Sequence, residues 1–198
     1  MENQEDLPKW VETSKFNEDK TILEQYIGDD TDIVIPSFVK EIGYWDVFIG
    51  AFYECNNLTS VVIPSSVTAI GKEAFGECTS LKSVSIPSSV TSIGDFTFHD
   101  CKSLKSIVIP SSVTSIGDEA FAGCKSLKSI VIPSSVTSIG NEAFAGCENL
   151  TDIEGLSSED YIDKGAFFGC TTLNEKTREF LEKKSPDCFD EYEDLDLD

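Results

Sequence analysis

Residues 104–126 read LKSIVIPSSVTSIGDEAFAGCKS, and this stretch decides the fold because the chain contains it several times over. An imperfect first copy begins near Ile33. The other copies begin at intervals of 23 residues, at Leu58, Leu81, Leu127 and, in degraded form, Leu150. Six cysteines keep the same interval, at Cys55, Cys78, Cys101, Cys124, Cys147 and Cys170. A period of this length predicts a solenoid in which each copy forms one turn and stacks on the next.

Within one copy, the apolar residues predict a short strand. Ile107 and Ile109 alternate with Val108, which is the pattern of a strand with one buried face. Pro110 cannot donate a backbone hydrogen bond to a neighbouring strand, so it marks the strand's end. A second, looser extended segment follows, from which Val113 and Ile116 are expected to point inward.

The remainder of the copy predicts two turns. Gly117 is expected to turn the chain with a positive φ, and Asp163, which replaces this glycine in the last copy, tolerates such a conformation. Ala120, Phe121 and Cys124 have the spacing of one tight helical turn that directs the ring inward.

One copy cannot bury its own apolar faces, so the array needs a cap at each end. We expect six repeats over residues 33–173, preceded by an N-terminal cap over 1–32 that consists of a short helix and a hairpin. Residues 174–185 have the composition of a capping helix. The acidic segment 186–198 is expected to be a disordered tail.

The charge of the chain bears on its partners. The net charge is −21, from 36 acidic and 15 basic residues. Such a surface repels phosphate backbones and anionic membranes, which argues against nucleic-acid partners. No apolar segment reaches the ~18 residues that a membrane span needs, and residues 1–10 show no signal-peptide pattern. We therefore expect no membrane insertion, and a cytoplasmic location by default.

The spacing L-x-x-I-x-I-P-x-x-V-x-x-I-G-x-x-A-F-x-x-C resembles the BspA-like leucine-rich repeats over roughly residues 16–173. The resemblance implies a β-rich, right-handed, curved solenoid with a parallel sheet on its concave side. Many members of this family are cell-surface or secreted proteins that bind host or partner proteins, which gives a surface or secreted location as the alternative. The family has no common catalytic residues to transfer to this chain.

The residues themselves also give no support to catalysis, a cofactor or a metal site. His99 is the single histidine, and the serines recur with the repeat, so none is singled out as a nucleophile. No two cysteines lie closer than 18 residues, whereas metal sites use clustered pairs. The cysteine column is interpreted as small core residues in preference to disulfides, because parallel side chains rarely reach disulfide geometry. Cys188 falls outside the repeat and is expected to be the most reactive thiol.

A protein-binding surface is the stronger hypothesis. Alternation along the strand places one residue of each copy in an outward column on the concave sheet: Val62, Ser85, Val108 and Val131, followed by Glu154. Serines stand where each strand begins: Ser60, Ser83, Ser106 and Ser129. A basic edge runs beside them: Lys82, Lys102, Lys105, Lys125 and Lys128. We expect this surface to receive a protein partner, although recent duplication of the repeat would produce the same regularity.

The expected function is therefore a monomeric, non-enzymatic scaffold for protein–protein interaction that binds its partner on the concave sheet. Two alternatives stay open at this point. One is a secreted or cell-surface adhesin that binds a host protein. The other is a structural solenoid that assembles with copies of itself.

Overall fold

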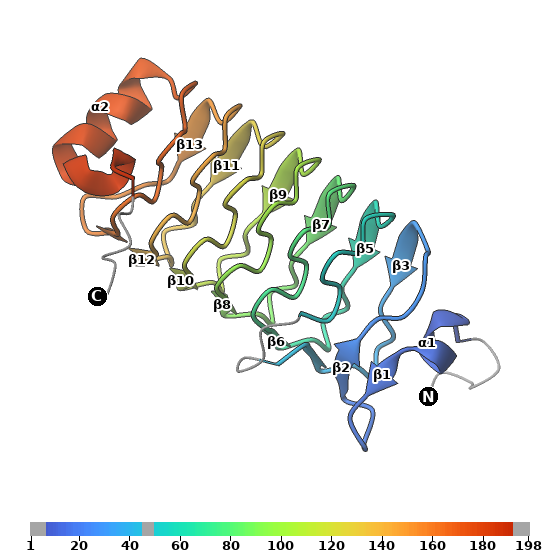
Figure 1. Ribbon diagram of the computed structural model, residues 1–198. Coiled ribbons are helices and arrows are strands. Elements are labelled where there is room, and N and C mark those ends of the chain that lie inside the picture. The colour runs from blue at the N-terminus through green and yellow to red at the C-terminus, as the bar shows by residue number, and fades with distance from the viewer. Residues whose placement is uncertain (1–6, 45–49, 192–198) are drawn as a thin grey trace, which may run out of the picture.

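The computed structural model describes residues 7–44 and 50–191 as a solenoid of six rungs, and Figure 1 shows the rungs stacked side by side. Rung 1 lies before Leu58, rungs 2 to 5 begin at Leu58, Leu81, Leu104 and Leu127, and rung 6 begins at Leu150. Each rung supplies one three-residue strand and one two-residue strand, so two rows of strands run along the solenoid. The repeat period thus becomes the stacking period, as predicted.

The three-residue strands form the first strand row. They are β3 (Asp32–Val34), β5 (Ser60–Val62), β7 (Ser83–Ser85), β9 (Ser106–Val108), β11 (Ser129–Val131) and β13 (Asp152–Glu154). Hydrogen bonds join them as a parallel sheet β3-β5-β7-β9 and a parallel pair β11-β13, with β9 and β11 adjacent in Figure 1. This row is the predicted parallel sheet.

The two-residue strands form the second strand row, where the looser extended segment was predicted. They are β4 (Glu41–Ile42), β6 (Ala69–Ile70), β8 (Ser92–Ile93), β10 (Ser115–Ile116), β12 (Ser138–Ile139) and β14 (Tyr161–Ile162). They also pair in parallel, in the segments β4-β6 and β8-β10-β12-β14. Equivalent residues of successive rungs pair with each other in both rows, so every sequence column becomes a column in space.

The core contains a stack of aromatic rings that runs the length of the solenoid. Each rung contributes one fully buried phenylalanine, and adjacent ring centroids are 5.1 to 5.5 Å apart. The rings are those of Phe52, Phe75, Phe98, Phe121, Phe144 and Phe167. Tyr26 stacks on Phe52 at 5.2 Å, and Trp10 meets the edge of Tyr26 at 5.6 Å, so the stack continues into the N-terminal cap.

The cysteine column lies in the core beside the rings, as predicted. All seven cysteines are free, and those of rungs 2 to 6 are buried, while Cys55 is half-buried. The thiol of Cys124 donates a hydrogen bond to the Phe98 carbonyl at 3.2 Å, and the equivalent contact recurs in rungs 2 to 6 at 3.0 to 3.3 Å. Each thiol therefore fills a small core space and satisfies a backbone carbonyl of the preceding rung.

The predicted turn chemistry is wrong in two respects. Gly117 does not have a positive φ; the left-handed residues are Glu119 (φ 50°) and Gly123 (φ 69°). A helical turn is also absent here, because these two residues interrupt it and the Phe121 N–H donates to Ala143 of the next rung at 2.8 Å. Glycine is needed at position 117 because the backbone of the preceding rung lies very close to it. A Cβ at this position would lie 2.7 Å from the backbone nitrogen of Asp95.

The N-terminal cap has the predicted short helix and hairpin. Helix α1 spans Trp10–Thr13, and strands β1 (Lys15–Phe16) and β2 (Ile22–Gln25) pair antiparallel. Strand β2 then pairs in parallel with β4, which attaches the hairpin to rung 1.

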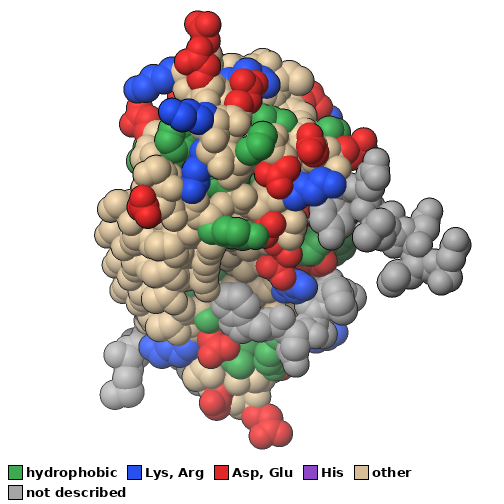
Figure 2. All heavy atoms as spheres, turned by 90° about the vertical axis from the view of Figure 1, so that its left-hand side faces the viewer, with side chains coloured by type: hydrophobic (Ala, Val, Ile, Leu, Met, Phe, Trp, Pro, Cys, Tyr) green, Lys and Arg blue, Asp and Glu red, His purple; other side chains and the backbone are tan. Residues whose placement is uncertain are grey.

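The C-terminal cap contains helix α2 (Glu175–Lys184), which lies over the last rung, as predicted. Asn174 caps the helix, because its side chain accepts a hydrogen bond from the Thr177 N–H at 2.9 Å. Leu181 is fully buried and supplies the apolar contact. Figure 2 looks onto this end and shows basic and acidic side chains interspersed, with hydrophobic side chains only in small separate areas.

The segment expected to be a disordered tail continues the cap. Residues Pro186–Phe189 form a 3-10 helix (η2), and Cys188 is fully buried, so the predicted reactivity of this thiol is wrong. The reason is a backbone requirement of rung 6: the Phe167 N–H donates to Cys188 at 2.8 Å, and the Gly165 N–H donates to Asp187 at 3.1 Å. These two carbonyls occupy the place of a seventh rung. Residues 192–198 lie outside the described part of the chain.

Candidate interaction surface

The outward column of the first strand row is exposed, as the alternation predicted. The exposed fractions of Val62, Val108 and Val131 are 55%, 72% and 58%. Their neighbours one residue away, such as Ile107, point into the core. Val62 on β5, Val108 on β9 and Val131 on β11 form an apolar stripe across the rungs that is interrupted at β7.

Ser85 interrupts this stripe and leaves a hollow. It lies between Val62 and Val108 in the register of β5, β7 and β9. A shallow depression of about 300 Å³ covers these three strands. The depression lies where serine, which is smaller than valine, occupies the outward position. The serine at position 85 could be read from the sequence, but the volume of the depression could be determined only from the structure.

Three lysines stand beside the serines that begin the strands. Lys82, Lys105 and Lys128 directly precede Ser83, Ser106 and Ser129, and all six residues are exposed. Within residues 7–44 and 50–191, these three lysine side chains form no ion pair. The charge of Lys82 does act on Asp32, because it helps to lower the pKa of that carboxyl.

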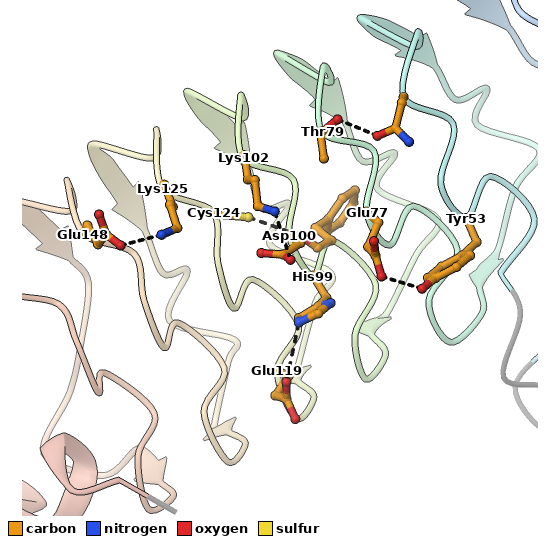
Figure 3. Close-up of polar contacts among 12 residues, drawn as sticks. Tyr53, Glu77, Thr79, His99, Asp100, Lys102, Glu119, Cys124, Lys125 and Glu148 are labelled. Carbon is orange, nitrogen blue, oxygen red and sulfur yellow. Dashed lines mark hydrogen bonds and ion pairs between the residues drawn. The ribbon is translucent and has the colours of Figure 1, made fainter.

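The predicted basic edge is not one continuous feature. Lys102 pairs with Asp100 at 3.3 Å, and Lys125 pairs with Glu148 at 2.6 Å. Figure 3 shows both pairs at the loops that follow the cysteine positions. These two lysines are neutralised within the chain, so the basic part of the surface reduces to the three lysines that precede the serines.

Acidic residues bound the surface at both ends. At the first rung, hydrogen bonds from Ser60, Thr31 and Thr59 lower the pKa of Asp32. At the last rung, Asp152 accepts a hydrogen bond from Asn174 at 2.8 Å, and Glu154 occupies the position of the valines. The unpaired lysines therefore mark only the central rungs.

Most of the contacts drawn in Figure 3 join successive rungs. The Tyr53 hydroxyl donates to Glu77, which raises the pKa of Tyr53 to about 12. His99 lies 3.8 Å from Glu119, whose pKa is raised by desolvation. Among the described residues, no group of three or more His, Cys, Asp or Glu side chains could hold a metal ion. None of the described helices is long and apolar enough to cross a membrane.

Two parallel strand rows, a buried phenylalanine and a leucine-led 23-residue unit define a leucine-rich-repeat protein. The family model described as "BspA type Leucine rich repeat region" matches residues 46–174 with six copies. The chain belongs to this family. Proteins of this kind are in general scaffolds for interaction or surface proteins, not enzymes.

Solved structures agree with this assignment. A leucine-rich-repeat protein of T. pallidum is 31% identical over 87% of this chain and 92% of that chain, with a TM-score of 0.70. A leucine-rich-repeat protein of Bacteroides ovatus is 37% identical over 81% of this chain and 44% of its own, with a TM-score of 0.68. A leucine-rich cell surface protein of Faecalibacterium prausnitzii is 38% identical over 74% and 38%, with a TM-score of 0.65. The chain thus spans less than half the length of the latter two. No curated protein matches the sequence.

Proposed function

We propose that this protein is a non-enzymatic scaffold that binds a protein partner on the outward face of β5, β7, β9 and β11. The observation that carries the proposal is the exposed valine stripe beside three unpaired lysines. Interaction sites commonly combine exposed apolar residues with charged residues beside them. Burial of the apolar residues under a partner contributes affinity, and the charged residues orient the partner. The stacked rungs hold these side chains in a fixed register, so binding requires little ordering of the surface.

The test is a comparison of two triple variants in pull-downs from lysate of the source cells. Val62→Asp/Val108→Asp/Val131→Asp places charge on the stripe. Thr91→Asp/Thr114→Asp/Thr137→Asp makes the same charge change at exposed positions beside the second strand row. A partner bound by the wild type and the threonine variant, but not by the valine variant, supports the proposal. Equal retention by both folded variants contradicts it, and circular dichroism establishes that each variant is folded.

A surface location is a second candidate, which the similarity to the Faecalibacterium prausnitzii cell surface protein favours. On this view the same face binds a protein outside the cell. Labelling of intact source cells with an antibody against the solenoid tests the location. Signal on intact cells supports it, whereas signal only after permeabilisation contradicts it.

A further inference from the structure

We infer that the partner segment on this face is an acidic, amphipathic α-helix that lies along the axis of the solenoid, across β7, β9 and β11. The inference rests on the proposed function, because it names the shape and charge of the segment that the face binds. Three observations carry it: the spacing of the lysines, the dimensions of the strand row and the acidic residues at its ends.

The spacing of the rungs is close to the pitch of an α-helix. The lysines belong to rungs 3, 4 and 5 and precede the neighbouring strands β7, β9 and β11 of the first strand row, which are spaced about 4.8 Å apart. An α-helix rises about 5.4 Å per turn, so residues i, i+4 and i+7 on one face follow this spacing. Three carboxylates at these positions would each meet one lysine.

An extended segment along the same axis does not match. Its side chains return to one face every second residue, which is about 6.6 Å. Across three rungs the mismatch accumulates, so only one or two carboxylates would reach a lysine. Spacing therefore favours a helix over a strand.

The dimensions of the face also suit a helix. A three-residue strand is about 10 Å long, which is close to the ~10–12 Å diameter of a helix with its side chains. A helix centred on the row would place its acidic stripe at Lys82, Lys105 and Lys128, and its apolar stripe on the valines. The hollow at Ser85 would accept one apolar side chain between Val62 and Val108.

The charges limit where the acidic stripe can lie. The chain has a net charge of −21, so an acidic partner is repelled by most of the surface. Asp32 at one end of the row, and Asp152 and Glu154 at the other, oppose any longer acidic stripe. The partner helix is thus expected to be acidic over about two turns, with neutral or basic residues beyond them.

The probe for the test is a stapled helical peptide of about four turns. It has Glu at i, i+4 and i+7, one apolar stripe, and a fluorescent label for anisotropy titration with the full chain at near-physiological salt. A second stapled peptide has the same composition with its Glu residues distributed around the helix. A third, unstapled peptide has the sequence of the first except for a central proline, which prevents helix formation. Two protein variants accompany them: Lys82→Glu/Lys105→Glu/Lys128→Glu, and the charge-matched control Lys15→Glu/Lys40→Glu/Lys183→Glu.

The in-register helix is expected to bind the wild type at least ten-fold more tightly than either other peptide. The first lysine variant should reduce its affinity at least ten-fold, and the control variant should change it no more than about two- to three-fold, by long-range charge alone. Equal reduction by both variants, or equal affinity of the two stapled peptides, overturns the inference.

Two further results separate the inference from the proposed function. If the proline peptide binds as tightly as the in-register helix and depends on the same three lysines, the face binds acidic segments but not as helices. If no peptide binds, the helix is overturned, and the valine variants then decide the proposed function on their own.

Discussion

Replacing Phe121 by leucine removes one ring from the middle of the aromatic stack. The side chain is fully buried, and its ring lies 5.4 Å from Phe98 and 5.2 Å from Phe144. Aromatic pairs contribute about 0.5–1.5 kcal/mol beyond the area they bury. Loss of two pairs therefore costs about 1–3 kcal/mol, in addition to the small cost of exchanging one large apolar residue for another.

Phe167→Leu is the matched control at the end of the stack. Phe167 is equally buried, but within the described part of the chain its ring stacks only on Phe144, at 5.3 Å. One lost pair predicts a cost lower by about 1 kcal/mol than that of Phe121→Leu. The two substitutions exchange the same atoms, so the difference isolates the contribution of stacking.

Equilibrium urea unfolding, followed by circular dichroism, measures both variants. The midpoint should fall further for Phe121→Leu, with the slope unchanged. A changed slope would mean that rungs unfold separately, and native-state hydrogen exchange would then give the free energy of each rung. Equal destabilisation of the two variants would refute the reasoning, because it would show that the rings contribute only by the area they bury.

Three further predictions concern the thiols, the C-terminal cap and the turns. Burial raises the pKa of Cys55 to about 11 and that of Cys188 to about 12. At pH 8 an aromatic disulfide reagent should therefore modify these two thiols slowly in the native protein and rapidly after urea is added. Rapid labelling of Cys188 in the native protein would contradict its place in the cap. Asn174→Ala should lower the free energy of unfolding, measured with urea, by about 1 kcal/mol, because the N-cap of helix α2 is lost. An unchanged urea midpoint would show that this cap does not contribute to stability. Gly117→Ala should lower the melting temperature more than Gly123→Ala, because the first Cβ meets the fixed backbone of Asp95, whereas the second strains a positive φ and meets the Asp100 side chain, which can rotate away. The opposite order would disprove this account.

The columns could be predicted from the sequence because a fixed period imposes a fixed register. Once each rung is 23 residues long, Ser83 must lie beside Ser106, and Val108 must lie outward between buried isoleucines. Helix α2 lies outside the repeats and was predicted from composition instead, and its bounds agree with that prediction. Periodicity therefore specifies position along and around the solenoid.

Contacts between rungs required the structure. Lys102 and Lys105 are exposed lysines only three residues apart, yet among the described residues Lys102 forms an ion pair, with Asp100, and Lys105 forms none. Cys188 was misjudged for a related reason: its acidic surroundings suggest a tail, whereas the last rung needs its backbone carbonyl. An apolar Cys188-Phe189 pair within an acidic segment was the signal available in the sequence.

The matching register of rungs 3, 4 and 5 has a consequence for how this gene can evolve. Each cap lies against a terminal rung, so an in-frame duplication or loss of one 23-residue unit in the middle leaves both ends with unchanged neighbours. Such an event would also add or remove one lysine–serine pair, and with it about one turn of a bound helix. The affinity for a bound helix can therefore change by the gain or loss of one 23-residue repeat, without any point mutation at the interface.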